Sequence, residues 1–475
     1  MTMPTKLLFV IAVFLCFPFS GNSQEVSSRE AMDLLVELIQ SKPLTGEERR
    51  AGLILEQYLR EKGFHTHIFT NEEDSYNFTA SLYPLDSGKP NYILTGHLDV
   101  VSAFDEEWTH PPFEGVIDDT VIWGRGTLDC LGPLAMQAAA LTNFKNSLDP
   151  DEELPYNFTI LALSGEEEGG HKGARIITSE YLDELHAKVI FGEGGSGIYD
   201  AIPSRPKTPV FGISIAEKSS LWLKLEASEK KVFGHGAAPP ALYANKRMIK
   251  GLIKLLDHRN PVVFNKVNRS MFKEFGRLEG GVKGFVIRKI NWIIFRPLVA
   301  KYFREGAAFE MFVKNTYVIT GISNPGPTGI NQIPSIASAT LDCRLLPGES
   351  RKRFIRKIDR ITGNKIDVEV ISQSPHADPS PILPEFDLFG EAIKTHYPTA
   401  EVAPFLFPAT TDNNYFRKEG IPVYGNYPTI NTEAMINAVH GTNEHIPIKE
   451  FENGIKVYTT LLHKLKALPI STDEP

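Results

Sequence analysis

The sequence predicts an α/β fold in which a helix-flanked mixed sheet is interrupted by a smaller α+β (ferredoxin-like) domain. Strand-like and helix-like segments alternate up to residue 212, which is typical of a sheet covered by helices. From residue 213 to 378 the pattern changes to strands grouped with two amphipathic helices, and from 379 to 475 the alternation resumes. A chain of 475 residues is also too long for one simple core, so two domains are expected.

The elements of the larger domain follow in order. Two amphipathic helices open it, and Gly63 ends the second of them. The segments after them read as strands at 65–70, 78–84, 91–100, 157–164 and 187–195, with helices at 132–145 and 169–185. A terminal helix at 451–468 closes the chain.

The smaller domain, residues 213–378, combines strands at 316–323, 335–348 and 365–374 with helices at 245–258 and 349–362. Between residues 262 and 318 lies a basic, aromatic-rich helical stretch, which we interpret as an elaboration of this domain. Its apolar residues are compatible with a hydrophobic substrate such as a fatty-acyl amino acid, but packing of this domain and of a dimer interface is the preferred explanation.

Residues 1–23 have the pattern of a secretory signal peptide: one lysine, an apolar stretch from Leu7 to Phe19, then small residues ending at Ser23. The apolar stretch is short for an uncleaved membrane anchor. We therefore expect cleavage after Ser23, so that residues 24–212 form the first part of the larger domain in the mature protein. That protein would be secreted or periplasmic and carry no stable membrane span.

Charge and cysteine content narrow the classes of function. A net charge of −8 leaves no basic stripe to neutralise phosphates, so nucleic acid is not an expected partner. Outside the signal peptide only Cys130 and Cys343 remain, so at most one disulfide is available and the core must supply most of the stability.

Several histidines and carboxylates follow predicted strands. His97 and Asp99 end the strand "LTGHLDVV", and two positions apart on a strand their side chains share one side. Asp129 stands in the glycine-rich segment "WGRGTLDCLGP", and Glu193 follows a strand in "GEGG". His440 lies in a polar loop near the C-terminus.

Each of these residues alone has an ordinary structural explanation, but together they indicate a metal site. Open α/β sheets build their sites at the carboxyl ends of strands. Two histidines with several carboxylates and no thiolate suit catalytic zinc, with cobalt or manganese as substitutes. A site with two ions needs a carboxylate that bridges them, and Asp129 is the candidate for that position.

These motifs together resemble the M20 family of co-catalytic di-zinc metallopeptidases, which includes carboxypeptidases, aminoacylases and N-acyl amino acid hydrolases. The resemblance runs from about residue 28 to the end. It rests on the segments "GHLDVV", "WTHPPFEGVIDDTVIWGRGTLDCLGP", "EEEGG", "GEGG", "GHGAAPP", "NQIPSIASATLDCRLLPGE" and "HGTNEHIPI".

The resemblance implies a role for each matched residue. His97 and His440 would each bind one of two zinc ions, Asp129 would bridge them, and Asp99 would orient His97. The interrupting domain would be a lid and dimerisation domain, so a homodimer is expected. His235 would reach the site of a second copy and polarise the scissile carbonyl.

The family's acidic pair supplies a general base and then a zinc ligand, but three glutamates follow one another here. Counting from the preceding strand makes Glu167 the base and Glu168 the ligand, and we prefer this register. Counting back from "GGHKGA" instead makes Glu166 the base and Glu167 the ligand.

Two other departures bear on the site. The family often has an aspartate where Gly192 stands, so Glu193 must serve as the metal ligand or that zinc site is weakened. An arginine common in the late "TTDNNYF" loop is absent, because Asn413 and Asn414 occupy the positions. Arg344 is then the candidate contact for a substrate carboxylate, or else an ion-pair partner within the smaller domain.

The sequence thus predicts a secreted di-zinc metallohydrolase that cleaves a peptide or N-acyl amide bond, using a water that bridges the metals and a glutamate base. Its substrate would be a small peptide or an N-acyl amino acid. The alternative is a binding protein of the same fold that has lost metal, as the glycine at position 192 suggests.

Overall fold

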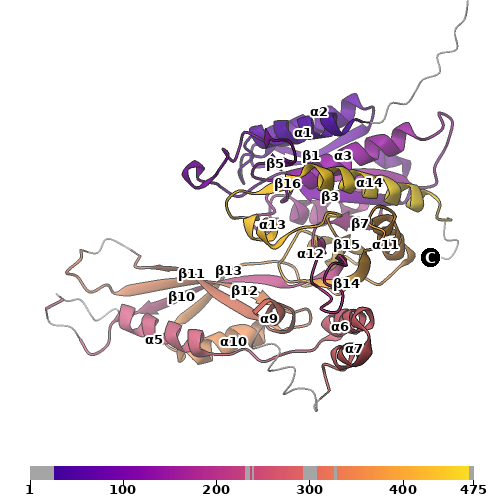
Figure 1. The fold of residues 1–475 in the computed structure, drawn as a ribbon. Coiled ribbons are helices and arrows are strands. Elements are labelled where there is room, and N and C mark those ends of the chain that lie inside the picture. Colours follow the sequence, from indigo (N-terminus) through magenta and orange to yellow (C-terminus); the bar gives the residue numbers. More distant parts are fainter. Residues whose placement is uncertain (1–25, 230–235, 238–239, 293–306, 326–328, 470–475) are drawn as a thin grey trace, which may run out of the picture.

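The computed structural model describes residues 26–229, 236–237, 240–292, 307–325 and 329–469. The predicted signal peptide and His235 lie outside these residues. Within them, no helix combines the length and the apolar character needed to cross a bilayer. The fold is α/β with two sheet-based domains, as predicted (Figure 1).

A nine-stranded mixed sheet forms the larger domain, with strand order β1-β2-β6-β3-β7-β15-β9-β14 and β8 paired to β9. Its strands are β1 (His65–Glu72), β2 (Ser75–Ser81), β3 (Asn91–His97), β6 (Asn157–Leu163), β7 (Ala187–Gly192), β8 (Gly197–Ile198), β9 (Val210–Glu217), β14 (Glu401–Phe407) and β15 (Val423–Gly425). Strand β3 runs parallel to both β6 and β7, whereas β1 and β2 add an antiparallel edge.

Helices cover both faces of this sheet, so its central strands are apolar on both sides. Strands β3 and β6 are buried along their whole length, which explains why apolar residues occupy both of their faces. The covering helices are α1 (Ser28–Gln40), α2 (Arg49–Glu61), α3 (Leu131–Asn146), α4 (Ala174–Ile176), α11 (Pro384–His396), α12 (Asn413–Lys418), α13 (Glu433–Ala438) and α14 (Ile448–Lys466). A small sheet of β4 (Val116–Ile117), β5 (Val121–Trp123) and β16 (His445–Pro447) joins residues distant in sequence.

The helix predicted at residues 169–185 begins later than expected. Gly169 and Gly170 have φ angles of +93° and +71°, in the left-handed region that a right-handed helix cannot contain. The segment from Glu166 to Gly173 is therefore a series of turns, and α4 begins only at Ala174.

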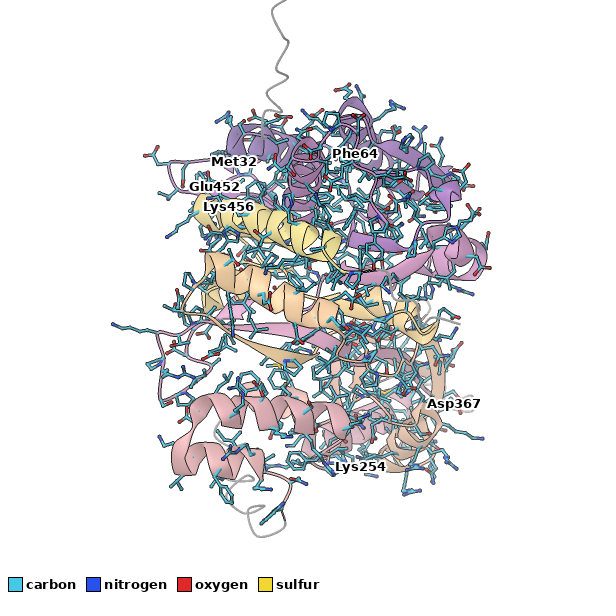
Figure 2. All side chains as sticks on the ribbon, turned by 90° about the vertical axis from the view of Figure 1, so that its right-hand side faces the viewer. Met32, Phe64, Lys254, Asp367, Glu452 and Lys456 are labelled. Atoms are coloured by element: carbon cyan, nitrogen blue, oxygen red, sulfur yellow. The ribbon has the colours of Figure 1, made fainter. Side chains whose placement is uncertain are left out.

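The smaller domain is a four-stranded antiparallel sheet with helices on one face. The strands, in order β11-β12-β10-β13, are β11 (Thr316–Ser323), β12 (Ile336–Leu345), β10 (Ser219–Ser228) and β13 (Asp367–Gln373). Helices α5 (Ala244–Asp257) and α10 (Arg351–Thr362) pack on it through a separate hydrophobic core. The two domains lie at opposite ends of the molecule: Met32 and Phe64 are far from Lys254 and Asp367 in Figure 2.

The chain enters the smaller domain after Glu217, the last residue of β9. The predicted boundary between residues 212 and 213 therefore falls inside a strand of the large sheet. Strand pairing explains the difference, because Val210 to Glu217 continue the parallel ladder with β14.

The stretch 262–318 also differs from expectation. Helices α6 (Lys266–Glu279) and α7 (Gly281–Arg288) lie in the sequence of the smaller domain, but α6 packs against β14 of the larger one and α7 packs on α6 (Figure 1). Val267, Met271 and Phe272 of α6 belong to the core cluster of the larger domain, and the Phe312 ring of α9 (Ala307–Val313) meets Phe405 of β14. This stretch therefore covers an edge strand of the large sheet.

Candidate metal centre

Three neighbouring parallel strands deliver acidic and imidazole side chains to one edge of the large sheet. His97 is the last residue of β3, Glu166 and Glu167 follow β6, and Glu193 follows β7. Since β3 pairs with both β6 and β7, the carboxyl ends of these strands meet. The predicted strand-end site is therefore assembled by the sheet itself.

Two groups of candidate ligands share one aspartate. His97, Asp129 and Glu193 form the first group, and Asp129, Glu167 and His440 form the second, with the ligand atoms of each group within 4.8 Å of one another. Nε2 of His97 lies 2.8 Å from Oδ1 of Asp129, and Nε2 of His440 lies 3.2 Å from Oδ2. The two oxygens of Asp129 thus face two different imidazoles, as a carboxylate bridging two cations would.

Asp99 supports this arrangement through its backbone as well as its side chain. Nδ1 of His97 lies 2.8 Å from the carbonyl oxygen of Asp99 and 3.4 Å from its carboxylate. The carboxylate accepts the backbone N–H groups of Glu166 and Glu167, both at 3.1 Å. Asp99 therefore orients His97 chiefly by its carbonyl, and its side chain fixes the start of the glutamate run.

Of the three glutamates, Glu166 and Glu167 face the centre and Glu168 does not. Glu166 groups with His97 and Glu167, whereas the side chain of Glu168 is exposed and outside every candidate ligand group among the described residues. Strand β6 ends at Leu163, and Gly165 has a φ of +68°, so the strand's alternation does not continue into the run. The arrangement matches the second register, in which Glu166 is the base and Glu167 the ligand. It does not match the preferred register, which made Glu168 a ligand.

Glu193 approaches the first group and is held by neighbours from other segments. Its Oε2 lies 4.0 Å from Nε2 of His97 and accepts a hydrogen bond from the Tyr427 hydroxyl at 3.3 Å. The Asn413 side-chain amide donates to the backbone oxygen of Glu193 at 2.7 Å. Sequence reasoning missed Tyr427 and saw Asn413 only as a missing arginine.

Asn413 also explains why residue 192 is glycine. A Cβ built on Gly192 would lie 2.4 Å from Oδ1 of Asn413, far closer than two such atoms can approach. The two departures from the family pattern are therefore complementary in space: the asparagine occupies the volume that a side chain at position 192 would need.

The centre concentrates negative charge away from water. Burial raises the pKa of Glu193 well above its usual range, with Asp129 adding to the shift and His97 opposing it. Hydrogen bonds to Asp129 and Glu167 raise the pKa of His440 to about 10. These carboxylates need compensating positive charge, which divalent cations supply as well as protons do. The donor set of imidazole and carboxylate fits zinc, cobalt or manganese.

The centre lies close to the junction of the two domains. The His171 ring, in the turns after the glutamate run, contacts the Ser372 hydroxyl of β13 at 3.1 Å. Arg344, the candidate contact for a substrate carboxylate, forms an ion pair with Asp342 at 3.0 Å. The ion-pair interpretation of Arg344 is therefore the one that the geometry favours.

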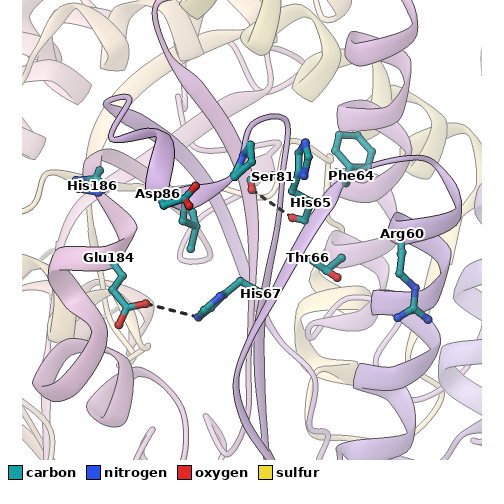
Figure 3. A pocket seen from close by; sticks show the side chains of 11 residues that line it. Arg60, Phe64, His65, Thr66, His67, Ser81, Asp86, Glu184 and His186 are labelled. Atoms are coloured by element: carbon teal, nitrogen blue, oxygen red, sulfur yellow. Dashed lines mark hydrogen bonds and ion pairs between the residues drawn. The ribbon is translucent and has the colours of Figure 1, made fainter.

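A separate pocket of about 600 Å³ lies against β1 and α2, lined by Phe64, His67 and Glu184 among others. His67 and Glu184 face each other across it at 3.5 Å (Figure 3). None of the predicted site residues lines this pocket, and its side chains form no candidate ligand group among the described residues.

Comparison with known proteins places the chain in a family. The family model for peptidase family M20/M25/M40 matches residues 93–464. The chain belongs to this family and is a hydrolytic enzyme of the metallopeptidase kind, as the motifs predicted.

Curated relatives are similar over most of their length. A probable carboxypeptidase S-like 2 of Dictyostelium discoideum is 27% identical over 407 residues, which cover 84% of this chain and 76% of the relative. The N-fatty-acyl-amino acid synthase/hydrolase PM20D1 of Homo sapiens is 26% identical, covering 82% and 77%.

Solved structures share the fold. A metallo-carboxypeptidase of the M20 family from Sulfolobus solfataricus superposes with a TM-score of 0.69 at 18% identity, over 92% of this chain and 100% of that one. Human carnosine dipeptidase 1 gives a TM-score of 0.66 at 14% identity, over 93% and 97%.

Proposed function

We propose that this chain is a secreted di-zinc hydrolase that cleaves a peptide or N-acyl amide bond. The observation that carries the proposal is the position of Asp129 between two imidazole–carboxylate groups. His97, Asp129 and Glu193 would hold one zinc ion, and Asp129, Glu167 and His440 the other. Relatives that hydrolyse N-acyl amino acids and peptides support this choice of bond.

Two zinc ions held there would polarise the scissile carbonyl and lower the pKa of the attacking water. Glu166 is the one acidic side chain of the run that faces the centre and is not needed in either group. Burial, reinforced by the charge of Glu193, raises its pKa well above the usual range of a carboxyl, as suits a group that must take up a proton and give it back. In the proposal Glu166 takes the proton of the water and returns it to the leaving amine.

Three single substitutions distinguish the roles. Glu166→Gln is expected to lower kcat by about 10²- to 10⁴-fold and leave zinc content unchanged, since it removes only the base. Glu167→Gln should lose zinc as well as activity. Glu168→Gln is the matched control, adjacent and exposed, and should retain both.

The assay is hydrolysis of dipeptides and of N-acyl amino acids with graded acyl length by zinc-loaded protein, with zinc measured by atomic emission. Full activity of Glu166→Gln together with inactivity of Glu168→Gln would restore the first register. Hydrolysis of no compound, with less than one zinc per chain, would favour the binding-protein alternative. Glu193 remains beside His97 despite Gly192, so the geometry does not favour that alternative.

A homodimer through the smaller domain is part of the proposal. Helix α5 presents Ile249, Ile253 and Leu256 to solvent with exposures of 54%, 50% and 71%, one turn apart along a single face. Such a contiguous apolar stripe is typical of an association surface. Ile253→Glu should convert the dimer to monomers in light scattering, whereas Lys250→Glu on the same helix should not.

Secretion completes the proposal. Cleavage after Ser23 would leave a mature chain that begins at Gln24. N-terminal sequencing of protein recovered outside the cell tests it, and a protein that keeps residues 1–23 would contradict it.

A further inference from the structure

Glu444 is a wholly buried carboxylate in the loop that joins His440 to β16. Its Oε1 accepts the backbone N–H groups of Leu128 and Asp129 at 2.8 and 3.1 Å. Its Oε2 accepts the N–H of Gly126 at 3.1 Å and Nη1 of Arg125 at 2.6 Å. Four donors therefore converge on one carboxylate, and three of them are backbone groups of the segment that carries Asp129.

Arg125 extends the same network to the other side of the centre. Its side chain is 2% exposed, and its Nη2 donates to the backbone oxygen of Gly441, directly after His440, at 2.7 Å. The N–H of Gly124 donates to the backbone oxygen of Glu444 at 3.0 Å, and β16 pairs with β5. Two segments more than 300 residues apart in the sequence are thereby joined.

Both joined segments are irregular and depend on outside contacts for their shape. Residues 124–130 form turns without helix or strand hydrogen bonds, and Gly126 has a φ of +91°. His440 has a φ of +58°, a left-handed conformation that costs free energy in a residue with a Cβ and persists only where surrounding contacts impose it. A buried charge with several donors supplies strong and directional contacts of this kind.

We propose that Glu444 is a positioning residue of the metal centre: with Arg125 it places Asp129 and His440 so that one aspartate faces both imidazoles. Glu444 itself stays out of both candidate ligand groups, so it acts through the backbone of Asp129 rather than on substrate. Its effect on turnover rests on the proposed function, whereas its effect on metal affinity does not.

The test replaces the carboxylate by an amide of the same size. In Glu444→Gln the amide NH2 faces backbone N–H groups, and two donors cannot form a hydrogen bond with each other. The segment that carries Asp129 must therefore shift. Zinc affinity, measured by competition with a chelator, should fall by about 10- to 100-fold. We expect kcat to fall with it and KM to change little.

Glu56→Gln is the matched control. Glu56 is also a buried carboxylate beside an arginine, 3.2 Å from Arg60, but it lies on α2 away from the centre. Both variants should lower the melting temperature of the metal-free protein, and only Glu444→Gln should lower zinc affinity. Wild-type zinc affinity in Glu444→Gln would overturn the inference.

Arg125→Lys provides a second variant if Glu444→Gln fails to fold. It keeps the charge beside Glu444 but loses the paired donation to Glu444 and Gly441, so zinc affinity should fall, most of all at the group that contains His440. Unchanged zinc affinities would contradict the inference. A wild-type protein that binds two zinc ions but hydrolyses nothing would refute the proposed function alone.

Discussion

Lys218 lies where the chain passes from β9 into the smaller domain, and its side chain is 0% exposed. Its Nζ contacts the Thr316 hydroxyl at 3.4 Å, and among the described residues it forms no ion pair with a carboxylate. Burial, reinforced by the charge of Arg344, lowers the pKa of Lys218 from 10.5 to about 8. A charge held in this place opposes folding.

The pKa shift gives the size of the effect. The two pKa values differ by roughly 2.5, and at about 1.36 kcal/mol per tenfold change in the proton equilibrium the charged lysine lowers the stability by about 3 kcal/mol. Below pH 8 the Lys218 amine is protonated in both the folded and the unfolded protein, so the full destabilisation applies. Between pH 8 and 10.5 the unfolded chain binds more protons than the folded one, so the free energy of unfolding should rise with pH.

Lys218→Met removes the charge and keeps a flexible apolar stem, so it should raise the free energy of unfolding by up to about 3 kcal/mol at pH 7. Urea unfolding of metal-free protein at pH 7 and pH 9.5 measures both effects. The wild type should gain stability at the higher pH, relative to the variant.

Lys224→Met is the control, because Lys224 lies on β10 with its side chain 37% exposed and should change stability by no more than about 0.5 kcal/mol. If Lys218→Met destabilises the protein at pH 7 and keeps the wild-type dependence on pH, the reasoning fails.

Three further outcomes are expected. Gly192→Ala should push Asn413 away from Glu193, and atomic emission should then show one zinc ion fewer per chain. Retention of both ions would show that the Asn413 side chain moves aside at little cost. Phe272 of α6 is 1% exposed, so Phe272→Ala should lower the free energy of unfolding by about 3–5 kcal/mol in urea titration. A loss below about 0.5 kcal/mol, as expected for a surface residue, would refute the packing of α6 on β14. Removal of zinc by a chelator should abolish hydrolysis and lower the melting temperature, because an ion that binds only the folded state stabilises it; an unchanged melting temperature would argue against bound metal.

The sequence predicted that His97 and Glu193 stand at strand ends, and the sheet places those ends together. His97 and Glu193 end or follow apolar strands, and the order of neighbouring strands in an α/β sheet brings such ends together. The family motifs added Asp129 and His440, which structure places against each other despite their separation.

The glutamate run shows where that reasoning stops. Counting along β6 assumes that alternation continues past the strand, but Gly165 turns the chain in the left-handed region. The carboxylate of Asp99, from another strand, then fixes the backbone of Glu166 and Glu167. A contact between distant segments, not the local pattern, decides which glutamates face the centre.

The sequence by itself determined most of the strands and helices and the kinds of side chain that gather at the strand ends, because periodicity and residue chemistry are local properties. Only the tertiary structure decided three things: the register of the glutamates, the packing of α6 on β14, and the burial of Glu444 against the segment of Asp129. Each depends on hydrogen bonds or apolar contacts between residues far apart in the chain, and such contacts leave no periodic trace in the sequence.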